Sequence, residues 1–188
     1  IEDPVKPRKA LIAIVATLLG GFIGVALVLL RKAMNRGVED PEVIEQLGLP
    51  VYATIPFSRD QLSAETKTKA QRNASPGLLA VSNPADLAIE ALRSLRTSLH
   101  FARLEAKNNI LMISGPSPGV GKSFVSANLG AIMAQAGQRV LLIDADMRKG
   151  YLNKLFKLPA ENGLSELLAT RITSKDAIYQ TEVELSLI

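Results

Sequence analysis

The run from Ala10 to Leu30 constrains this chain more than any other feature, because it contains no charged side chain and only one hydroxyl, that of Thr17. At about 1.5 Å of helical rise per residue, the run spans roughly 30 Å, the thickness of a bilayer's hydrocarbon core. A signal peptide has a shorter apolar core, and a buried core helix rarely stays apolar on every face. The run therefore predicts a transmembrane helix over residues 10–30.

Basic residues flank this run on both sides and do not orient it, because the positive-inside rule counts nearly equal charge at each end. They are Lys6, Arg8 and Lys9 before the run, and Arg31, Lys32 and Arg36 after it. The orientation has to come from the rest of the chain. Gly20 and Gly24, one turn apart, either allow a second membrane helix to approach closely or reflect how common glycine is in such helices.

The rest of the chain divides into three parts. At 188 residues the chain suits one domain with an appendage. Residues 1–9 are a Pro- and Lys-rich lead-in, residues 31–82 a juxtamembrane segment and linker, and residues 83–188 the start of a folded domain. The chain begins with Ile1 rather than Met and stops at Ile188 within a pattern, so we expect a piece of a longer protein.

The juxtamembrane part carries three local signals. Asp40-Pro41 predicts a helix start and Gly48 its end. The alternation in Val51–Ile55 predicts a short strand. Residues 59–77 are polar and basic and predict a mobile linker, whose basic side chains either contact anionic lipid or are simply solvated.

A longer helix is expected from Asn83 onward, with Asn83 as its cap and Pro84 in its first turn. Its apolar stripe at helical spacing comprises Leu87, Ala91, Leu95 and Leu99.

A candidate phosphate-binding loop, Ser114–Ser123, lies between an apolar run, Ile110–Ser114, and a predicted helix over 122–136 that Gly137 closes. Glycines allow several backbone N–H groups to approach one anion, and a helix N-terminus adds its positive end. Lys122 would reach the β- and γ-phosphates, and Ser123 would bind Mg²⁺. The alternative is a Gly-rich turn without a ligand. The expected nucleotide-binding residues are Ser117, Pro118, Gly119, Val120, Gly121, Lys122, Ser123 and Phe124.

This loop departs from the strict P-loop pattern. The pattern asks for a glycine where the chain has Pro116, and the nearest glycine is Gly115. Pro116 and Pro118 also remove two backbone donors.

A second apolar run, Val140–Ile143, ends in two carboxylates, Asp144 and Asp146. Open α/β sheets bind ligands at the carboxyl ends of their strands. One aspartate could hold Mg²⁺ while the other accepts a proton or orients the nucleophile, although an Asp at a strand end also often caps a helix. Strand, loop, helix and strand form one βαβ unit whose two strands should be parallel neighbours. The fold class predicted is α/β, a P-loop NTPase with a parallel sheet.

These motifs resemble those of the bacterial tyrosine autokinases of the polysaccharide co-polymerase, or chain-length determinant, family. The family's Pro-containing phosphate loop matches Pro118–Ser123, and its second acidic motif matches Leu141–Arg148. The wider deviant P-loop class of cell-division and partition ATPases, the MinD/ParA-like proteins, shares the fold. Many of that class carry a lysine early in the loop, where this chain has Gly115, Pro116 and Ser117.

Two further matches favour the kinases. Glu90, Arg93 and Arg96 reproduce the family's Glu-x-x-Arg-x-x-Arg helix, and the resemblance implies that this helix joins neighbouring subunits into a homo-oligomer ring. Taken alone, the three charges could be a solvated helix face. Tyr151 follows Asp146 by five residues, as does a phosphorylated tyrosine in the proteobacterial members, although it could also be a tyrosine packed on the surface.

The resemblance implies an inner-membrane protein with its P-loop domain in the cytoplasm, which binds Mg²⁺ and ATP and transfers the γ-phosphoryl to tyrosines of neighbouring subunits. It would regulate capsule or exopolysaccharide polymerisation and export. Lys122, Asp144 and Asp146 would be catalytic, and Ser123, Asp144 and Asp146 would hold the metal. Expected partners are a tyrosine phosphatase, polysaccharide export and polymerase proteins and the membrane, with no nucleic acid.

The resemblance also implies parts beyond this chain. Residues 1–9 would end a periplasmic chain-length-determinant domain, while a third acidic motif and a tyrosine cluster would follow Ile188. The piece alone should then be inactive. Two rival functions are a membrane-tethered MinD/ParA-like ATPase switch without a protein acceptor, and a non-catalytic chain-length regulator that kept a nucleotide fold as a scaffold.

Overall fold

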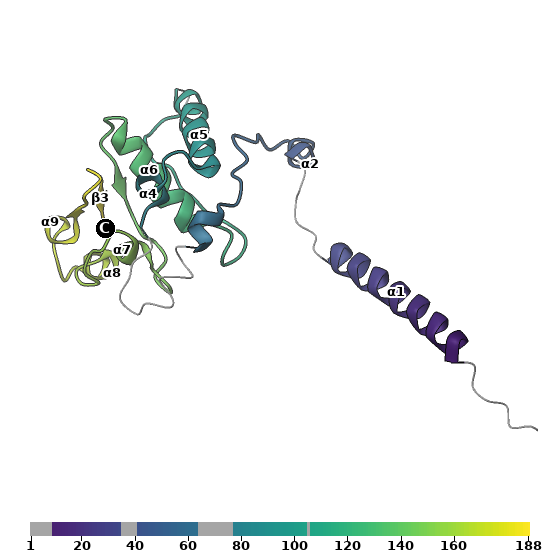
Figure 1. The fold of residues 1–188 in the computed structure, drawn as a ribbon. Coiled ribbons are helices and arrows are strands. Elements are labelled where there is room, and N and C mark those ends of the chain that lie inside the picture. Colours follow the sequence, from purple (N-terminus) through teal and green to yellow (C-terminus); the bar gives the residue numbers. More distant parts are fainter. Residues whose placement is uncertain (1–8, 35–40, 64–76, 105) are drawn as a thin grey trace, which may run out of the picture. The chain divides into compact units, whose positions relative to one another are not determined.

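The computed structural model describes residues 9–34, 41–63, 77–104 and 106–188 (Figure 1). The backbone contacts divide the chain into two units, Ile1–Pro50 and Val51–Ile188. Each unit is described by itself.

The first unit contains the apolar run as one helix. Helix α1, Lys9–Met34, includes all of residues 10–30, and its stretch Lys9–Arg31 is long and apolar enough to cross a membrane. Large apolar side chains along it are exposed, among them Leu18 at 69% and Phe22 at 73%. The Thr17 hydroxyl donates to Ala13 O at 2.9 Å, so the only polar side chain in the run is satisfied within the helix.

Helix α2, Pro41–Glu45, confirms the predicted helix start. Gly48 follows with φ 80°, and its N–H donates to Glu45 O at 2.8 Å, which ends the helix as predicted. Asp40 lies outside the described residues. Val43 and Leu47 are 51% and 75% exposed, so the apolar face of α2 is not buried.

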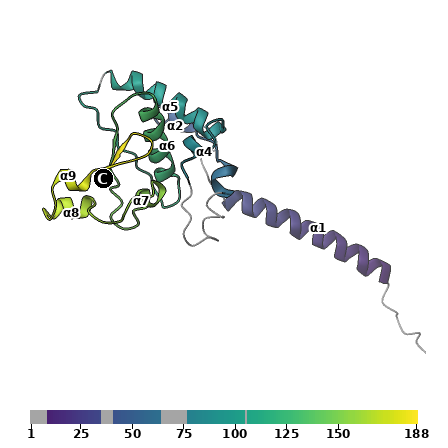
Figure 2. The same cartoon turned by 60° about the vertical axis from the view of Figure 1, so that its left-hand side comes forward.

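The second unit is built around helix α6, Lys122–Gln135, which follows the phosphate loop as predicted. Helices α4, Leu79–Ser82, and α5, Leu87–Arg103, pack against α6 (Figure 2). Asn128, only 1% exposed, fixes one of these contacts, because its Oδ1 accepts from Ala80 N at 2.8 Å. The core around α6 is made chiefly by Leu79, Ile89, Leu92, Leu129, Ile132, Leu185 and Leu187.

The predicted start of the long helix is wrong by three residues. Asp86 is the N-cap of α5, and its Oδ1 accepts from Ala88 N at 2.8 Å, whereas Asn83 ends α4. Both are good capping residues, but a carboxylate also favours the positive end of the helix. The buried face differs from the predicted stripe as well, because Leu87 is 75% exposed while Ile89 and Leu92 are fully buried.

A mixed sheet of three short strands lies against this core. Strand β1 is Leu141–Leu142, β2 is Tyr179–Gln180 and β3 is Ser186–Leu187, in the order β1-β3-β2. Strands β1 and β3 are parallel, and β2 and β3 are antiparallel. The ladder of β1 extends to its acidic end, because Asp144 N donates to Ile188 O at 3.0 Å.

The predicted pairing of the two apolar runs is wrong, because the parallel neighbour of β1 is β3 and Ile110–Ser114 forms no strand. Ile110 and Met112 are each 84% exposed, while Ile113 packs against the core. A segment forms a strand only when a neighbouring strand pairs with it. The strand that pairs with β1 is β3, whose Leu187 is buried in the core.

Residues 51–63, which we call the connector, belong to the second unit. The structure corrects the predicted strand Val51–Ile55, which lies in no sheet. Its burial alternates as a strand's would, with Ile55 against the core and Tyr52 exposed. The predicted mobile linker is also wrong in part, because residues 59–63 are helical; residues 64–76 lie outside the described residues.

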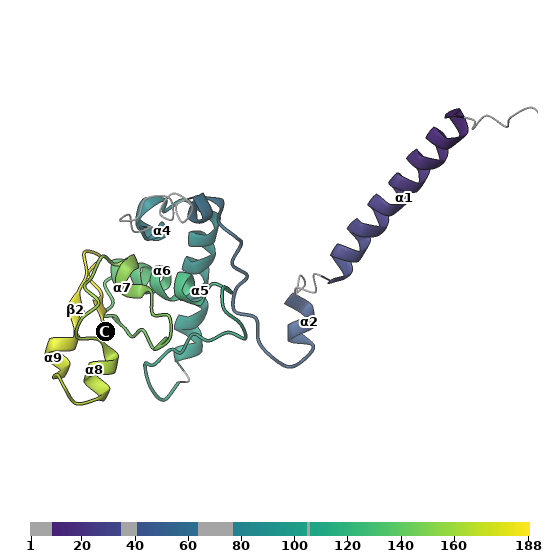
Figure 3. The same cartoon turned by 90° about the horizontal axis from the view of Figure 1, so that it is seen from below.

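Three short helices complete the unit (Figure 3): α7, Leu152–Leu155, α8, Leu164–Leu168, and α9, Ser174–Ala177. Helix α8 confirms the short helix predicted after Asn162-Gly163, and it packs against α9. Their starts are held by carboxylates. Glu166 Oε2 accepts from Gly163 N at 3.0 Å, and Asp176 Oδ2 accepts from Thr173 N at 3.1 Å.

Candidate functional site

The phosphate loop, residues 114–123, turns sharply into α6 through two glycines. Gly119 and Gly121 have φ of 78° and 93°, and Gly121 is the N-cap of α6. Side chains are strained in this left-handed region, so the loop needs glycine at these positions. The result is a tight loop that ends at the first turn of α6, where the backbone N–H groups have no partner within the helix.

A third glycine explains the departure from the strict P-loop pattern. A Cβ atom at Gly115 would lie 2.8 Å from Val120 Cγ2 and 3.3 Å from Lys122 Cγ. The close approach across this loop therefore occurs at Gly115, one residue before the position where the strict pattern has glycine. Pro116 occupies that position instead.

Lys122 closes the loop on itself. Its Nζ donates to Ser117 O at 2.9 Å, which holds the ammonium group beside the loop backbone. Ser123 is exposed in the same turn. The N–H groups of the first turn of an α-helix have no partner within the helix, and α6 runs for 14 residues behind them. All eight predicted nucleotide-binding residues lie at this loop–helix junction: Ser117, Pro118, Gly119, Val120, Gly121, Lys122, Ser123 and Phe124.

The acidic loop, residues 144–151, follows β1, and its first carboxylate is engaged by backbone. Asp144 Oδ2 accepts from Tyr151 N at 3.0 Å and Leu152 N at 3.1 Å, and Asp144 Oδ1 accepts from Asp146 N at 3.1 Å. Asp144 therefore receives the first N–H groups of α7. The capping role that an aspartate at a strand end often plays is the role that Asp144 has in this structure.

Asp146 is held by two backbone N–H groups of its own loop. Its Oδ1 accepts from Lys149 N at 3.0 Å and Arg148 N at 3.1 Å. These two hydrogen bonds, together with the positive charges of Lys122 and Lys149, lower the pKa of Asp146 below its ordinary value. The positive charge of Lys122, from the other motif, therefore acts on Asp146.

No three His, Cys, Asp or Glu side chains gather around one point in the described part of the chain. This does not bear on a Mg²⁺ site of the predicted kind, because Mg²⁺ is often held by one or two carboxylates with water and substrate phosphates. Ser123, Asp144 and Asp146 remain the predicted ligands.

Tyr151 lies at the end of the acidic loop, directly before α7, and is 37% exposed. Its N–H is one of the groups that Asp144 accepts. The position of this predicted phosphosite is thus tied to the acidic motif through the backbone, a link that residue spacing does not reveal.

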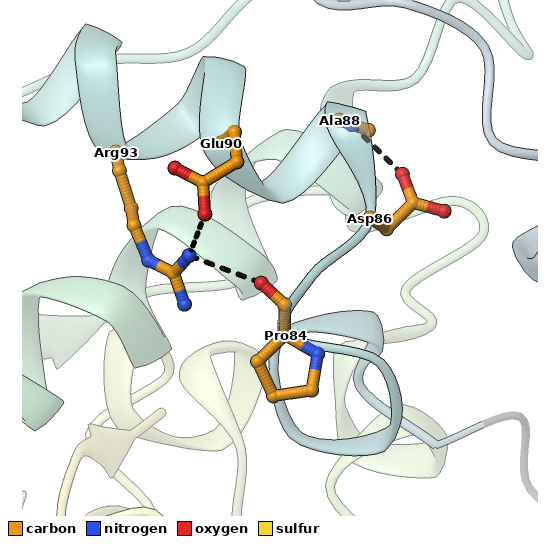
Figure 4. Close-up of polar contacts among 5 residues, drawn as sticks. All are labelled: Pro84, Asp86, Ala88, Glu90 and Arg93. Atoms are coloured by element: carbon orange, nitrogen blue, oxygen red, sulfur yellow. Dashed lines mark hydrogen bonds and ion pairs between the residues drawn. The ribbon is translucent and has the colours of Figure 1, made fainter.

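Arg93 on the charged face of α5 has contacts within the chain that sequence reasoning missed (Figure 4). Arg93 forms an ion pair with Glu90, and its guanidinium also donates to Pro84 O at 3.0 Å. The acceptor is a backbone carbonyl, which carries no sequence signature. Arg96 lies on the same helix and is half-buried. The subunit contact predicted for Glu90, Arg93 and Arg96 stays a prediction.

Comparison with known families identifies the class to which the fold and the two loops belong. A family model described as the CobQ/CobB/MinD/ParA nucleotide binding domain matches residues 111–162, which include both loops. A second model, described as a G-rich domain on putative tyrosine kinase, matches residues 1–33. The chain carries a P-loop nucleotide-binding domain of the MinD/ParA kind, as its motifs predict.

Individual relatives narrow this class. The chain is 48% identical over 186 residues to a putative tyrosine-protein kinase in the cps region of Klebsiella pneumoniae, covering 97% of this chain and 26% of the relative. It is 51% identical over 176 residues to the tyrosine-protein kinase etk of Escherichia coli K12, covering 89% and 24%. The chain therefore belongs to the bacterial tyrosine kinase family, as the resemblance predicts, and spans about a quarter of the length of these relatives.

Solved structures agree with this assignment. The BceF tyrosine kinase domain has a TM-score of 0.76 and 43% identity, over 81% of this chain and 62% of that one. The kinase domain of the Escherichia coli tyrosine kinase ETK has a TM-score of 0.71 and 48% identity, over 81% and 60%.

Proposed function

We propose that the protein to which this chain belongs is an ATP-dependent tyrosine autokinase. The observation that supports this most directly is the placement of Lys122 at the first position of α6, with its Nζ held beside the loop backbone at Ser117 O. The relatives' names, tyrosine-protein kinase, support the reaction class.

In this proposal the phosphate loop binds the triphosphate. Lys122 and the N–H groups of residues 119–124 offer a cation and several donors on one side of the loop, which suits an anion with several oxygens. A bound Mg²⁺ would neutralise charge that develops on the β- and γ-phosphates. Ser123, Asp144 and Asp146 supply the oxygen ligands that Mg²⁺ prefers. One of the two aspartates would hold this ion, and the other would accept the tyrosine proton or orient the hydroxyl.

The proposed location is the bacterial inner membrane, with α1 crossing it, residues 1–9 ending a periplasmic domain and the P-loop domain in the cytoplasm. The exposed apolar surface of α1 supports membrane insertion. The name of the Klebsiella relative, which places it in a cps region, supports a role in capsule or exopolysaccharide polymerisation and export. The proposed partners are a tyrosine phosphatase, proteins of polysaccharide export and polymerisation, and further copies of the chain that contact Glu90, Arg93 and Arg96 in a ring.

The test uses Lys122→Met in the full-length protein, with Lys107→Met as the matched control. Lys107 is an exposed lysine outside the loop, so the control makes the same side-chain change away from the phosphates. We expect Lys122→Met to lose phosphotyrosine to background and Lys107→Met to keep it, as measured by immunoblot on protein purified free of other kinases.

Two further readouts separate the rival functions. Wild-type protein that releases inorganic phosphate from ATP without forming phosphotyrosine would be a MinD/ParA-like switch. Wild-type protein that binds no ATP in a fluorescent-nucleotide titration would be a scaffold. Either outcome, or phosphotyrosine persisting in Lys122→Met, would contradict the proposal.

A further inference from the structure

The connector is fastened to α5 by a buried polar contact. Ser58 is only 7% exposed, although its neighbours Phe57 and Arg59 are exposed. Its hydroxyl donates to Asp86 Oδ2 at 2.7 Å, across 28 residues of sequence. A buried hydroxyl needs such a partner, because losing one partner of a buried hydrogen bond costs more than an average bond contributes.

Both partners of this bond are also helix caps. Ser58 Oγ accepts from Gln61 N at 3.2 Å at the start of the helical residues 59–63. Figure 4 shows the other cap, in which Asp86 Oδ1 accepts from Ala88 N at 2.8 Å at the start of α5. One continuous set of hydrogen bonds therefore joins two helix N-termini through a hydroxyl and a carboxylate. The negative carboxylate suits this place, because the N-termini of helices are positive.

A second bond runs beside the first. Asn83 Nδ2 donates to Asp60 Oδ2 at 2.8 Å, again between the connector and the turn before α5. We call the Ser58–Asp86 and Asp60–Asn83 bonds together the cap bridge.

The turn that the cap bridge holds is also the turn that Arg93 holds. Arg93 donates to Pro84 O at 3.0 Å and pairs with Glu90, while Asn83 and Asp86 on either side of Pro84 bond to the connector. The carbonyl that places the Arg93 guanidinium is thus fixed from the connector side. A shift of the connector would move Pro84 O, which is one of the two acceptors that position the Arg93 guanidinium.

We propose that Asp86 is a positioning residue that couples the connector to the Glu90–Arg93 pair, so that subunit association through α5 depends on the cap bridge. This rests on the proposed function, in which α5 contacts a second copy of the chain. The connector is the segment by which the chain leads from α1 to the nucleotide-binding domain. Tension or release on the membrane side would then reach the subunit contact through two side-chain hydrogen bonds.

The sharpest variant is Asp86→Ser. Serine is as good an N-cap as aspartate, so the cap of α5 is kept, but its side chain has no second oxygen to accept from the Ser58 hydroxyl. Ser58→Ala removes the bridge from the other side, and Ser58→Thr restores the hydroxyl. Thr54→Ala, an exposed hydroxyl on the same connector, is the matched control.

The experiment uses the full-length protein in lipid nanodiscs and reads three quantities: hydrogen exchange of the connector and of the first turn of α5, oligomer mass, and affinity for a fluorescent ATP analogue. We expect Asp86→Ser and Ser58→Ala to raise exchange in both segments by about tenfold and to shift the protein toward smaller oligomers. Nucleotide affinity should stay within about twofold. Ser58→Thr and Thr54→Ala should behave as wild type.

Two results would overturn the coupling. If exchange rises only at residues 59–63, Ser58 is a local cap without effect on α5. If exchange rises in both segments but oligomer mass is unchanged, the bridge does not govern assembly, and the kinase proposal stands without it. Wild-type protein that stays monomeric would instead overturn the proposed subunit contact, and the coupling with it.

Discussion

The phosphate loop and the acidic loop use their polar groups in different ways. In the phosphate loop, Lys122 Nζ donates to Ser117 O, while the N–H groups at the start of α6 have no acceptor within the helix. In the acidic loop, the carboxylates of Asp144 and Asp146 accept five backbone N–H groups of the loop and of α7. The phosphate loop therefore leaves backbone donors without a partner in the helix, whereas the acidic loop uses its carboxylates to bind its own backbone.

The difference indicates which of the two loops needs a ligand to satisfy its polar groups. A backbone N–H group can be satisfied by water or by an external anion, so the phosphate loop is suited to receive phosphate oxygens. The acidic loop is held by its own hydrogen bonds and keeps its shape without help. A metal bound there would have to compete with N–H groups for Asp144, whereas one oxygen of Asp146, its Oδ2, takes no part in the two loop hydrogen bonds described.

Gly121→Ala should break the phosphate loop and has the largest expected effect. An alanine at φ 93° costs about 1–2 kcal/mol, and relaxing this strain would turn the first N–H groups of α6 away from the loop. We expect at least about tenfold weaker binding of a fluorescent ATP analogue to the full-length protein, measured by titration.

Gly163→Ala is the matched control for Gly121→Ala. Gly163 is also the N-cap of a helix, but its φ is −92°, and a Cβ there would meet only Glu166 Oε2 at an ordinary 3.7 Å. Equal nucleotide affinity in the two variants would show that the left-handed turn does not shape the phosphate site.

Asp144→Ala should loosen the acidic loop with the next largest effect. It leaves the N–H groups of Tyr151 and Leu152 without their acceptor, and Leu152 is only 4% exposed. We expect the free energy of unfolding to fall by about 1–2 kcal/mol in denaturant titrations. Asp146→Ala should change it less, because water can replace the carboxylate at the exposed residues 148 and 149. The reverse order would mean that the loop is held by Asp146.

Tyr151→Phe distinguishes the role of the tyrosine hydroxyl from the role of the Tyr151 backbone in the acidic loop. Asp144 contacts the Tyr151 N–H, which the variant keeps, so the hydrogen bond between Asp144 and the Tyr151 backbone should persist. Mass spectrometry of the full-length protein should then show loss of phosphate on this peptide only, while Tyr52→Phe, an exposed tyrosine on the connector, should not alter that peptide. A phosphate found on the wild-type chain but never at Tyr151 would leave this residue with a structural role alone.

The sequence was sufficient where the determinants are local. Gly121-Lys122-Ser123 before a largely apolar stretch places both the phosphate loop and the start of α6, because loop and helix cap are adjacent in the chain. Gly48 and Gly137 end their segments for the same reason, since each takes the positive φ that a helix end requires.

The sequence was insufficient where the local structure depends on a contact with a segment far away in the chain. Ile110–Ser114 and Val140–Ile143 look alike as apolar runs, but only the second pairs in the sheet, because strand pairing depends on the packing of β3. The caps of α5 show the same limit: Asn83 and Asp86 are both good N-caps, and the choice follows from what Ser58 and Asp60 contact. The Arg93 contact with Pro84 O has no signal in the sequence at all.

The smallest expected effect concerns Asp176, a carboxylate outside the candidate site. A pH titration of Asp176 tests whether local hydrogen bonds lower its pKa as they do for Asp146. Hydrogen bonds from the Thr173 hydroxyl at 2.6 Å and the Thr173 N–H lower the pKa of Asp176 below 3.8. Because the folded pKa is the lower one, this carboxylate stabilises the fold above pH 3.8, and the contribution is lost as pH falls through the folded pKa. We expect Thr173→Ala to move the Asp176 titration, followed by NMR, back toward 3.8, and Thr173→Ser to leave it low. A wild-type Asp176 that titrates at 3.8 would show that local capture of a carboxylate does not favour its charged form here, and would remove the reason to expect it at Asp146.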